Sequence, residues 1–242
     1  MNFSMEIGPH TDLDTLPALK EVYITFLPGG SHEETANKAA NLVKKGFNPI
    51  PHFPARSIEN ESQLKEYVSK CKDVGVKQAL VIGGSGEPVG RFDSSIQLLE
   101  TGYFEQMKIG IAGHPEGSPD ISDSKLEKAM KDKKPYADYI VTQWLLDSQK
   151  IIEFISKQTI PVHVGITGPL KITSLIKFAN IVGAKNSINF LKSNLSKAFD
   201  LMKPKDPNDL IGKVKEFTDN FHIYTFGGLK ETNKWLRENN YV

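Results

Sequence analysis

Residues 22–53 read VYITFLPGGSHEETANKAANLVKKGFNPIPHF and contain one complete strand–helix–strand unit. The apolar run at 22–26 predicts a buried strand, and the run at 49–53 predicts a second one. Ser31 precedes a helical stripe of alanines and can cap that helix, which Gly46 is placed to end. Two strands joined through a helix in this way are expected to pair in parallel.

The same alternation repeats along the whole chain. Eight short apolar runs are separated by loops and helical stretches, at 3–7, 22–26, 49–53, 79–82, 108–112, 139–142, 162–166 and 222–226. Several are rich in Val and Ile, which is typical of strands buried on both faces. Eight strands alternating with helices predict a (β/α)8 TIM barrel, an α/β fold, forming a single domain over residues 1–242. An open doubly wound sheet is the alternative, but no glycine-rich nucleotide fingerprint follows the first strand.

The helical stretches show apolar stripes and recognisable ends. The stripes lie at 36–43, 64–71, 151–155, 175–182, 188–202 and 210–217. Asp147 can cap the third of these helices, and Pro207 suits the first turn of the last one. Apolar residues at helical spacing are what packing against a core requires, so we interpret the stripes as core faces.

Composition excludes several classes of function. The 242 residues include 30 Lys and Arg against 29 Asp and Glu, which leaves a formal net charge of +1 and no basic footprint for nucleic acid. Cys71 is the single cysteine, so an internal disulfide or a Cys-x-x-Cys metal site is excluded, and no metal is expected. No apolar stretch could span a membrane, and the first ten residues do not resemble a signal peptide. We therefore expect a cytoplasmic protein.

Chemistry in a barrel takes place at the carboxyl ends of its strands. Three polar residues end otherwise apolar strands: Glu6, His52 and Gln143. A buried polar group costs free energy, roughly 1–3 kcal/mol, unless it is paired. Three such groups at one end of a barrel favour a functional site, although each alone could be a paired core residue.

Four motifs resemble the methylenetetrahydrofolate reductase family and occur in the same order as in that family. IGIAGHPEG at 109–117 resembles its VAGYPEGHPE, and ADYIVTQ at 137–143 resembles its ADFIITQ. FSMEIGP at 3–9 resembles the family's first strand, and HIYT at 222–225 resembles its closing HFYT. The family fold is a barrel that binds FAD, and the single-domain bacterial enzymes are the most similar type.

The resemblance also implies a role for individual residues. Glu6 matches the family's catalytic acid, and Gln143 and Tyr224 match the folate-binding positions. The positions that would contact FAD are Thr25, His52, Gly84, Ser85, Ala112, His114, Lys128 and Lys131. The reaction that the family catalyses is the interconversion of 5,10-methylenetetrahydrofolate and 5-methyltetrahydrofolate, with NADH or NADPH as electron donor.

A protonated Glu6 suits this chemistry. The one-carbon unit of methylenetetrahydrofolate lies between two nitrogens, and hydride cannot attack it until a proton on the leaving nitrogen opens the ring. Burial raises the pKa of a carboxyl group, so we expect Glu6 to hold a proton near neutral pH. The alternative is a structural Glu6 that is paired with a buried Lys or His.

The sequence departs from the family pattern at the proposed flavin site. Gly83, Gly84 and Ser85 stand where the family has Arg-Gly-Asp, and His114 replaces a Tyr. Lysines occupy the helix that would contact the FAD phosphates, although a helix face exposed to solvent would look the same.

Three hypotheses therefore remain open. The first is a flavin-dependent reductase of methylenetetrahydrofolate, and the second is a physiological 5-methyltetrahydrofolate oxidase that uses the same site. The third is a folate-binding or partner-binding barrel without flavin. We expect a folate substrate, no nucleic-acid or membrane partner, no C-terminal regulatory domain, and a possible homo-oligomer.

Overall fold

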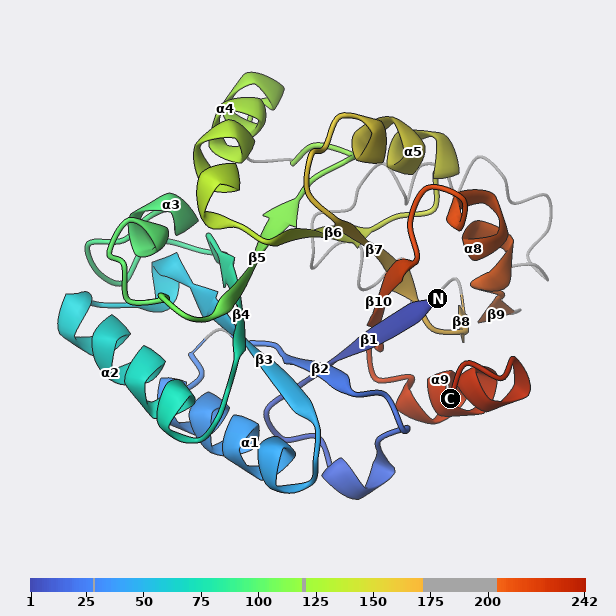
Figure 1. The fold of residues 1–242 in the computed structure, drawn as a ribbon, viewed down its shortest axis with the longest axis horizontal. Helices are drawn as coiled ribbons and strands as arrows, with labels where there is room; N and C mark the ends of the chain where they lie inside the picture. The colour runs from blue at the N-terminus through green and yellow to red at the C-terminus, as the bar shows by residue number, and fades with distance from the viewer. Residues whose placement is uncertain (28, 119–120, 172–203) are drawn as a thin grey trace.

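A computed structural model describes residues 1–27, 29–118, 121–171 and 204–242. Eight parallel strands form a closed barrel in the order β1-β10-β7-β6-β5-β4-β3-β2. The helices surround the strands, and the chain begins and ends on the same side of the barrel (Figure 1). The predicted (β/α)8 barrel is confirmed, and the open doubly wound alternative is wrong because β1 pairs with β10.

The barrel strands follow the predicted apolar runs closely. They are β1 (Asn2–Ile7), β2 (Glu21–Ile24), β3 (Asn48–Pro54), β4 (Gln78–Ile82), β5 (Lys108–Gly113), β6 (Tyr139–Trp144), β7 (Val162–Thr167) and β10 (Asn220–Tyr224). A small antiparallel pair, β8 (Leu170–Lys171) and β9 (Pro204–Lys205), lies outside the barrel sheet.

Seven α-helices are defined within the described residues. They are α1 (His32–Lys44), α2 (Glu61–Asp73), α3 (Ser95–Leu99), α4 (Asp123–Lys133), α5 (Ser148–Ser156), α8 (Asn208–Val214) and α9 (Leu229–Glu238). Short 3-10 turns occupy Leu13–Thr15, Ala55–Ser57 and Lys134–Tyr136. None of the helices in this part of the chain is both long and apolar enough to cross a membrane.

The predicted caps of α1 and α5 are confirmed, whereas the stripe predicted at 210–217 runs past α8, which ends at Val214, and Phe217 is 50% exposed. The Ser31 hydroxyl accepts hydrogen bonds from the first-turn amides of α1, and the Asp147 carboxylate does the same for α5. Gly46 follows α1 with a φ of 84°, a left-handed conformation that favours glycine. The stripes predicted at 175–182 and 188–202 lie outside the described residues.

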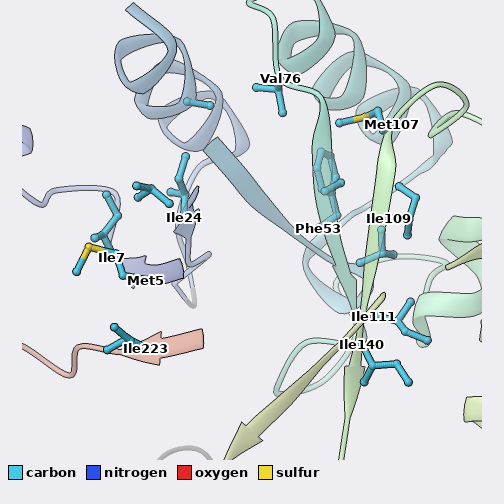
Figure 2. Packing of buried hydrophobic residues seen from close by; sticks show 14 of the residues in the cluster. Met5, Ile7, Ile24, Phe53, Val76, Met107, Ile109, Ile111, Ile140 and Ile223 are labelled. Carbon is cyan, nitrogen blue, oxygen red and sulfur yellow. The ribbon is translucent and has the colours of Figure 1, made fainter. Parts of the chain in front are cut away.

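Side chains alternate between the two faces of each strand, and this alternation separates core from site. Residues such as Met5, Ile7, Ile24 and Ile223 belong to the large cluster between strands and helices, part of which is drawn in Figure 2. A separate cluster contains Tyr23, Ile50, Leu80, Tyr139 and Val141. This second cluster lies inside the barrel. A side chain two residues farther along the same strand, toward its carboxyl end, therefore also faces the interior, at the open end of the barrel.

Gly110 on β5 makes room for one of these interior side chains. A Cβ atom at Gly110 would lie 2.6 Å from Cε2 and 2.7 Å from Cζ of Tyr139. We predict that Gly110→Ala lowers the free energy of unfolding by about 1–3 kcal/mol, because the buried Tyr139 ring would have to move. Urea denaturation measures the change.

Gly212 in α8 provides the matched control, since a Cβ there meets nothing within 4 Å. Gly212→Ala should raise stability by roughly 0.5–1 kcal/mol, as is usual inside a helix. A Gly110→Ala variant as stable as the unaltered protein would show that the ring of Tyr139 does not need this space.

Candidate active site

Glu6 occupies the carboxyl end of β1, and its side chain is 18% exposed. Its carboxylate is held between two imidazoles from different strands. The Oε2 atom of Glu6 lies 3.4 Å from Nε2 of His52 on β3 and 3.6 Å from Nε2 of His222 on β10. The barrel therefore brings two predicted site residues, Glu6 and His52, into direct contact and adds His222 to them.

The two histidines change the acid–base behaviour of Glu6. Burial alone raises the pKa of Glu6, but the N–H group of His222 and the charges of His52 and His222 together outweigh it. The pKa of Glu6 is therefore lowered, and the raised pKa expected from its apolar strand is wrong. At neutral pH the carboxyl group of the unliganded protein is ionised.

His52 is buried, and its own pKa is also lowered. Burial is the main cause, and His222 lowers the pKa further, whereas the negative charge of Glu6 raises it in part. At neutral pH an uncharged His52 therefore lies beside an ionised Glu6. Both pKa values lie below neutral pH, so a proton that enters this pair is readily passed on.

Aromatic rings fill the barrel interior below this cluster. The ring of Tyr23 lies edge-on to His222 at 4.4 Å, and its hydroxyl donates to the Tyr139 hydroxyl at 3.3 Å. Tyr139 in turn stacks on His163 at 4.5 Å. These contacts hold the histidine rings in place, and the ring layer closes the floor of the site.

Gln143 is on β6, whereas Tyr224 on β10 is the register partner of Glu6 and lies 4.7 Å from the ring of His222. The Tyr224 hydroxyl donates to the Thr142 carbonyl at 2.9 Å, which ties β10 to β6 just before Gln143. The Oε1 atom of Gln143 and the Nε1 atom of the neighbouring Trp144 are buried and have no hydrogen-bond partner. Unpaired buried polar atoms are costly, so these two are suited to a polar ligand.

Of the predicted flavin contacts near β2 and β4, Thr25 lies close to Glu6, whereas Ser85 does not face the barrel interior. The Thr25 amide donates to the Ile7 carbonyl at 2.9 Å, which places Thr25 beside the end of β1. Gly84 has a φ of 85°, and a Cβ atom there would lie 3.0 Å from Cβ of Pro54. Ser85 is exposed to solvent in the loop that follows β4. These roles remain predictions.

The segment after β5 contains a cation that the sequence did not single out. Lys133, at the end of α4, is buried, and its Nζ atom donates to the Ala112 carbonyl at 3.3 Å. Burial lowers the pKa of Lys133 to about 8. Burial and then the charge of Lys133 lower the pKa of His114 to about 4. By contrast, Lys128 and Lys131 are exposed, and Lys128 pairs with Asp132 at 2.5 Å.

Comparison with known proteins identifies the family. The sequence profile of the family described as methylenetetrahydrofolate reductase matches residues 13–225. The chain belongs to the methylenetetrahydrofolate reductase family. Methylenetetrahydrofolate reductase 1 of Schizosaccharomyces pombe (strain 972 / ATCC 24843) is 26% identical over 189 residues, which cover 70% of this chain and 31% of that protein. The chain thus spans about a third of the length of this relative.

Solved structures of other enzymes share the fold. Oxaloacetate acetylhydrolase bound to 3,3-difluorooxalacetate has a TM-score of 0.59 at 10% identity, over the whole of this chain and 80% of that one. A 2,3-dimethylmalate lyase has the same TM-score at 8% identity, over the whole of this chain and 81% of that one. At these identities, the similarity between this chain and the two solved structures concerns the barrel fold alone.

The residues of the site fit the FAD that the family implies. The buried ammonium of Lys133 suits a diphosphate. The unpartnered Oε1 of Gln143 and Nε1 of Trp144 fit a polar heterocycle. Both observations concern this chain's own atoms and do not depend on the exposed Ser85.

The sequence analysis did not single out His222 and Lys133. Each could have been found from the side of its strand or helix that it shares with inward-facing residues. His222 is two residues before Tyr224 on the same strand, so both side chains face inward with Glu6. Lys133 is seven residues after Leu126 and three after Met130, both half-buried, so it shares the inner face of α4. The same periodicity that identified the core could have found both.

We predict that Lys133 makes stability depend on pH in the alkaline range. Its pKa is about 8 when folded and 10.5 when free, so the unfolded chain binds more protons between these values. The free energy of unfolding therefore rises with pH across this interval, by roughly 3 kcal/mol at most. Urea denaturation at a series of pH values measures this rise, which Lys133→Met should remove.

Lys131→Met is the control, because Lys131 lies on the same helix but is exposed. It should leave the alkaline rise unchanged. Equal pH dependence in the unaltered protein and in Lys133→Met would mean that the Lys133 ammonium is hydrated in solution.

Proposed function

We propose that this protein interconverts 5,10-methylenetetrahydrofolate and 5-methyltetrahydrofolate, with bound FAD and a nicotinamide cofactor as electron partner. Membership of the methylenetetrahydrofolate reductase family supports a folate-related oxidoreductase. The observation that carries the proposal is Glu6, a carboxylate at the open end of the barrel with an imidazole on either side. A proton donor and acceptor is what opening and closing the folate ring requires.

Glu6 would deliver its proton to the leaving nitrogen of the methylene bridge. Because its pKa is lowered, Glu6 must first take up a proton, and a His52 ring that has itself taken one from solvent is near enough to pass it on. After the transfer, the N–H groups of His52 and His222 stabilise the carboxylate that remains. The two histidines thus make a protonated Glu6 a stronger acid toward the substrate.

Binding of the reactants is proposed for the residues around Glu6. Gln143 would hydrogen-bond the pterin ring, and Tyr224 would border it. The FAD would be held by Thr25, His52, Gly84, Ala112 and His114, with Lys133 beside its diphosphate and Ser85, Lys128 and Lys131 at its edge. A bound FAD would supply the hydride chemistry that amino-acid side chains lack.

The oxidative direction is the second candidate, and the state of Glu6 favours it. In that direction the ring closes, and a nitrogen of the folate gives up a proton. An ionised Glu6 is ready to accept that proton without prior loading. Initial rates in both directions with the purified protein, at one pH and saturating substrates, test which direction is faster.

A visible spectrum and a titration with FAD separate a flavoprotein from a flavin-less barrel. We predict a yellow protein, or a colourless one that binds added FAD and quenches its fluorescence. Lys133→Met should weaken FAD binding more than Lys131→Met, because Lys133 alone of the two is buried. A protein that binds folate but no FAD would contradict the flavin-dependent proposal.

We predict that Glu6→Gln lowers folate turnover by about 10²–10⁴-fold, because the amide keeps the shape but has no transferable proton. Stopped-flow kinetics of the folate half-reaction measures this loss. Reduction of the flavin by nicotinamide needs no such proton and should persist. Glu238→Gln, at an exposed residue of α9, is the control. Turnover within a few-fold of the unaltered protein would exclude Glu6 as the acid.

We predict that Gln143→Ala weakens folate binding by about 0.5–1.5 kcal/mol, the value of one hydrogen bond. Its Oε1 atom is buried and has no hydrogen-bond partner within the protein, so it is free to accept a hydrogen bond from a ligand. Calorimetric titration with folate and with FAD compares the two affinities. Gln149→Ala, at an exposed position, is the control. Equal losses for both ligands would indicate a structural role instead.

A further inference from the structure

His222 joins Glu6 to a second buried group, the hydroxyl of Ser4. The His222 side chain is fully buried on β10. Its Nδ1 atom lies 3.1 Å from Oγ of Ser4, and its Nε2 atom lies 3.6 Å from Oε2 of Glu6. Ser4 and Glu6 are two residues apart on β1, so they meet the two nitrogens of one ring.

The Ser4 hydroxyl has a single proton and two possible acceptors. One is Nδ1 of His222 at 3.1 Å, and the other is the Phe221 carbonyl at 3.5 Å. The nearer acceptor makes the better hydrogen bond. When Ser4 donates to Nδ1, the proton of a neutral His222 ring must be on Nε2, which faces Glu6.

The ring itself has little freedom to turn. Tyr23 lies edge-on to His222 at 4.4 Å, and Tyr224 lies edge-on to it at 4.7 Å with an interplanar angle of 89°. A buried ring clamped by two aromatic neighbours keeps its orientation. The nitrogen that holds the proton is therefore set by the groups at its two ends, Ser4 at Nδ1 and Glu6 at Nε2.

We propose that Ser4 and His222 form a positioning pair that holds an N–H group toward Glu6 and keeps its carboxyl group ionised until substrate is bound. The use of this pair in catalysis rests on the proposed function, but its effect on Glu6 does not. The separation of 3.6 Å is longer than a good hydrogen bond, and such contacts in unliganded active sites commonly shorten when substrate binds.

An experiment on Ser4 must distinguish its effect on Glu6 from the effects of the other groups around Glu6 and His222. His52 from β3 contacts the same oxygen of Glu6, and Tyr224 on β10 and Tyr23 on β2 flank the ring of His222. His163 on β7 lies farther away, below Tyr139. All of these remain in place when only the Ser4 hydroxyl is removed, so Ser4→Ala isolates its contribution.

The experiment is NMR on the full chain without folate or flavin. Histidine labelled with ¹⁵N reports which nitrogen of His222 holds the proton, and glutamate labelled with ¹³C at the carboxyl carbon reports the titration of Glu6. Glu6→Gln and His222→Gln assign the two signals. Tyr139→Phe removes a buried hydroxyl that does not touch Glu6 and is the matched control.

We expect the Nε2–H form of His222 in the unaltered protein. Ser4→Ala should weaken this preference and move the titration midpoint of Glu6 to higher pH, whereas Tyr139→Phe should move neither. His222→Gln places an amide N–H near the position of Nε2 and should keep the midpoint low, but the shorter side chain of His222→Asn should not. The directly measured form of His222 in the unaltered protein does not depend on any variant folding.

The Nδ1–H form in the unaltered protein, or an unmoved Glu6 midpoint in Ser4→Ala, would overturn the proposal. Failure of the proposed function has a different signature. In that case Glu6→Gln retains folate turnover while the midpoint of Glu6 still shifts in Ser4→Ala. Failure of the positioning pair leaves Glu6→Gln inactive and the midpoint unmoved.

Discussion

Closure of the barrel by the pairing of β1 with β10 is the constraint on which the site depends. The two strands come from opposite ends of the described chain and pair in parallel from Asn2 with Asn220 to Glu6 with Tyr224. The Ser4 hydroxyl reaches His222 across this seam, and the Thr225 hydroxyl donates to the Glu6 carbonyl at 3.0 Å. Without the seam, Glu6 would lose His222, whose hydrogen bond is the largest of the effects that lower its pKa.

The barrel interior accepts polar groups because each has a defined neighbour. Tyr23 and Tyr139 share a hydrogen bond, and Gly110 leaves the space that the Tyr139 ring fills. The exceptions among the described barrel strands are four residues that each have one buried atom without a hydrogen-bond partner: His52, Gln143, Trp144 and His222. Groups that are costly in the unliganded protein thus coincide with the place where strand ends converge, as is typical of binding sites.

Periodicity was enough to predict the fold, and the strand-end rule was enough to bring Glu6 and His52 together. It could not predict the direction in which the pKa of Glu6 moves. The burial of Glu6, which raises its pKa, can be inferred from the sequence of β1 alone. The imidazole groups that lower its pKa come from β3 and β10, and their position beside Glu6 is known only from the structure. Lys133 was overlooked for a related reason, since the lysines of α4 look alike until the buried face of the helix is known.

The seam between β1 and β10 also orders the events of folding. Local units such as β2, α1 and β3 can form from neighbouring residues, whereas pairing of β1 with β10 requires closure of a loop that spans most of the chain. During synthesis, β1 leaves the ribosome first and has no partner on that side until β10 follows. The cluster of Glu6, His52 and His222 is therefore completed last, and a chain stopped before β10 would leave one edge of β1 exposed to association with other chains.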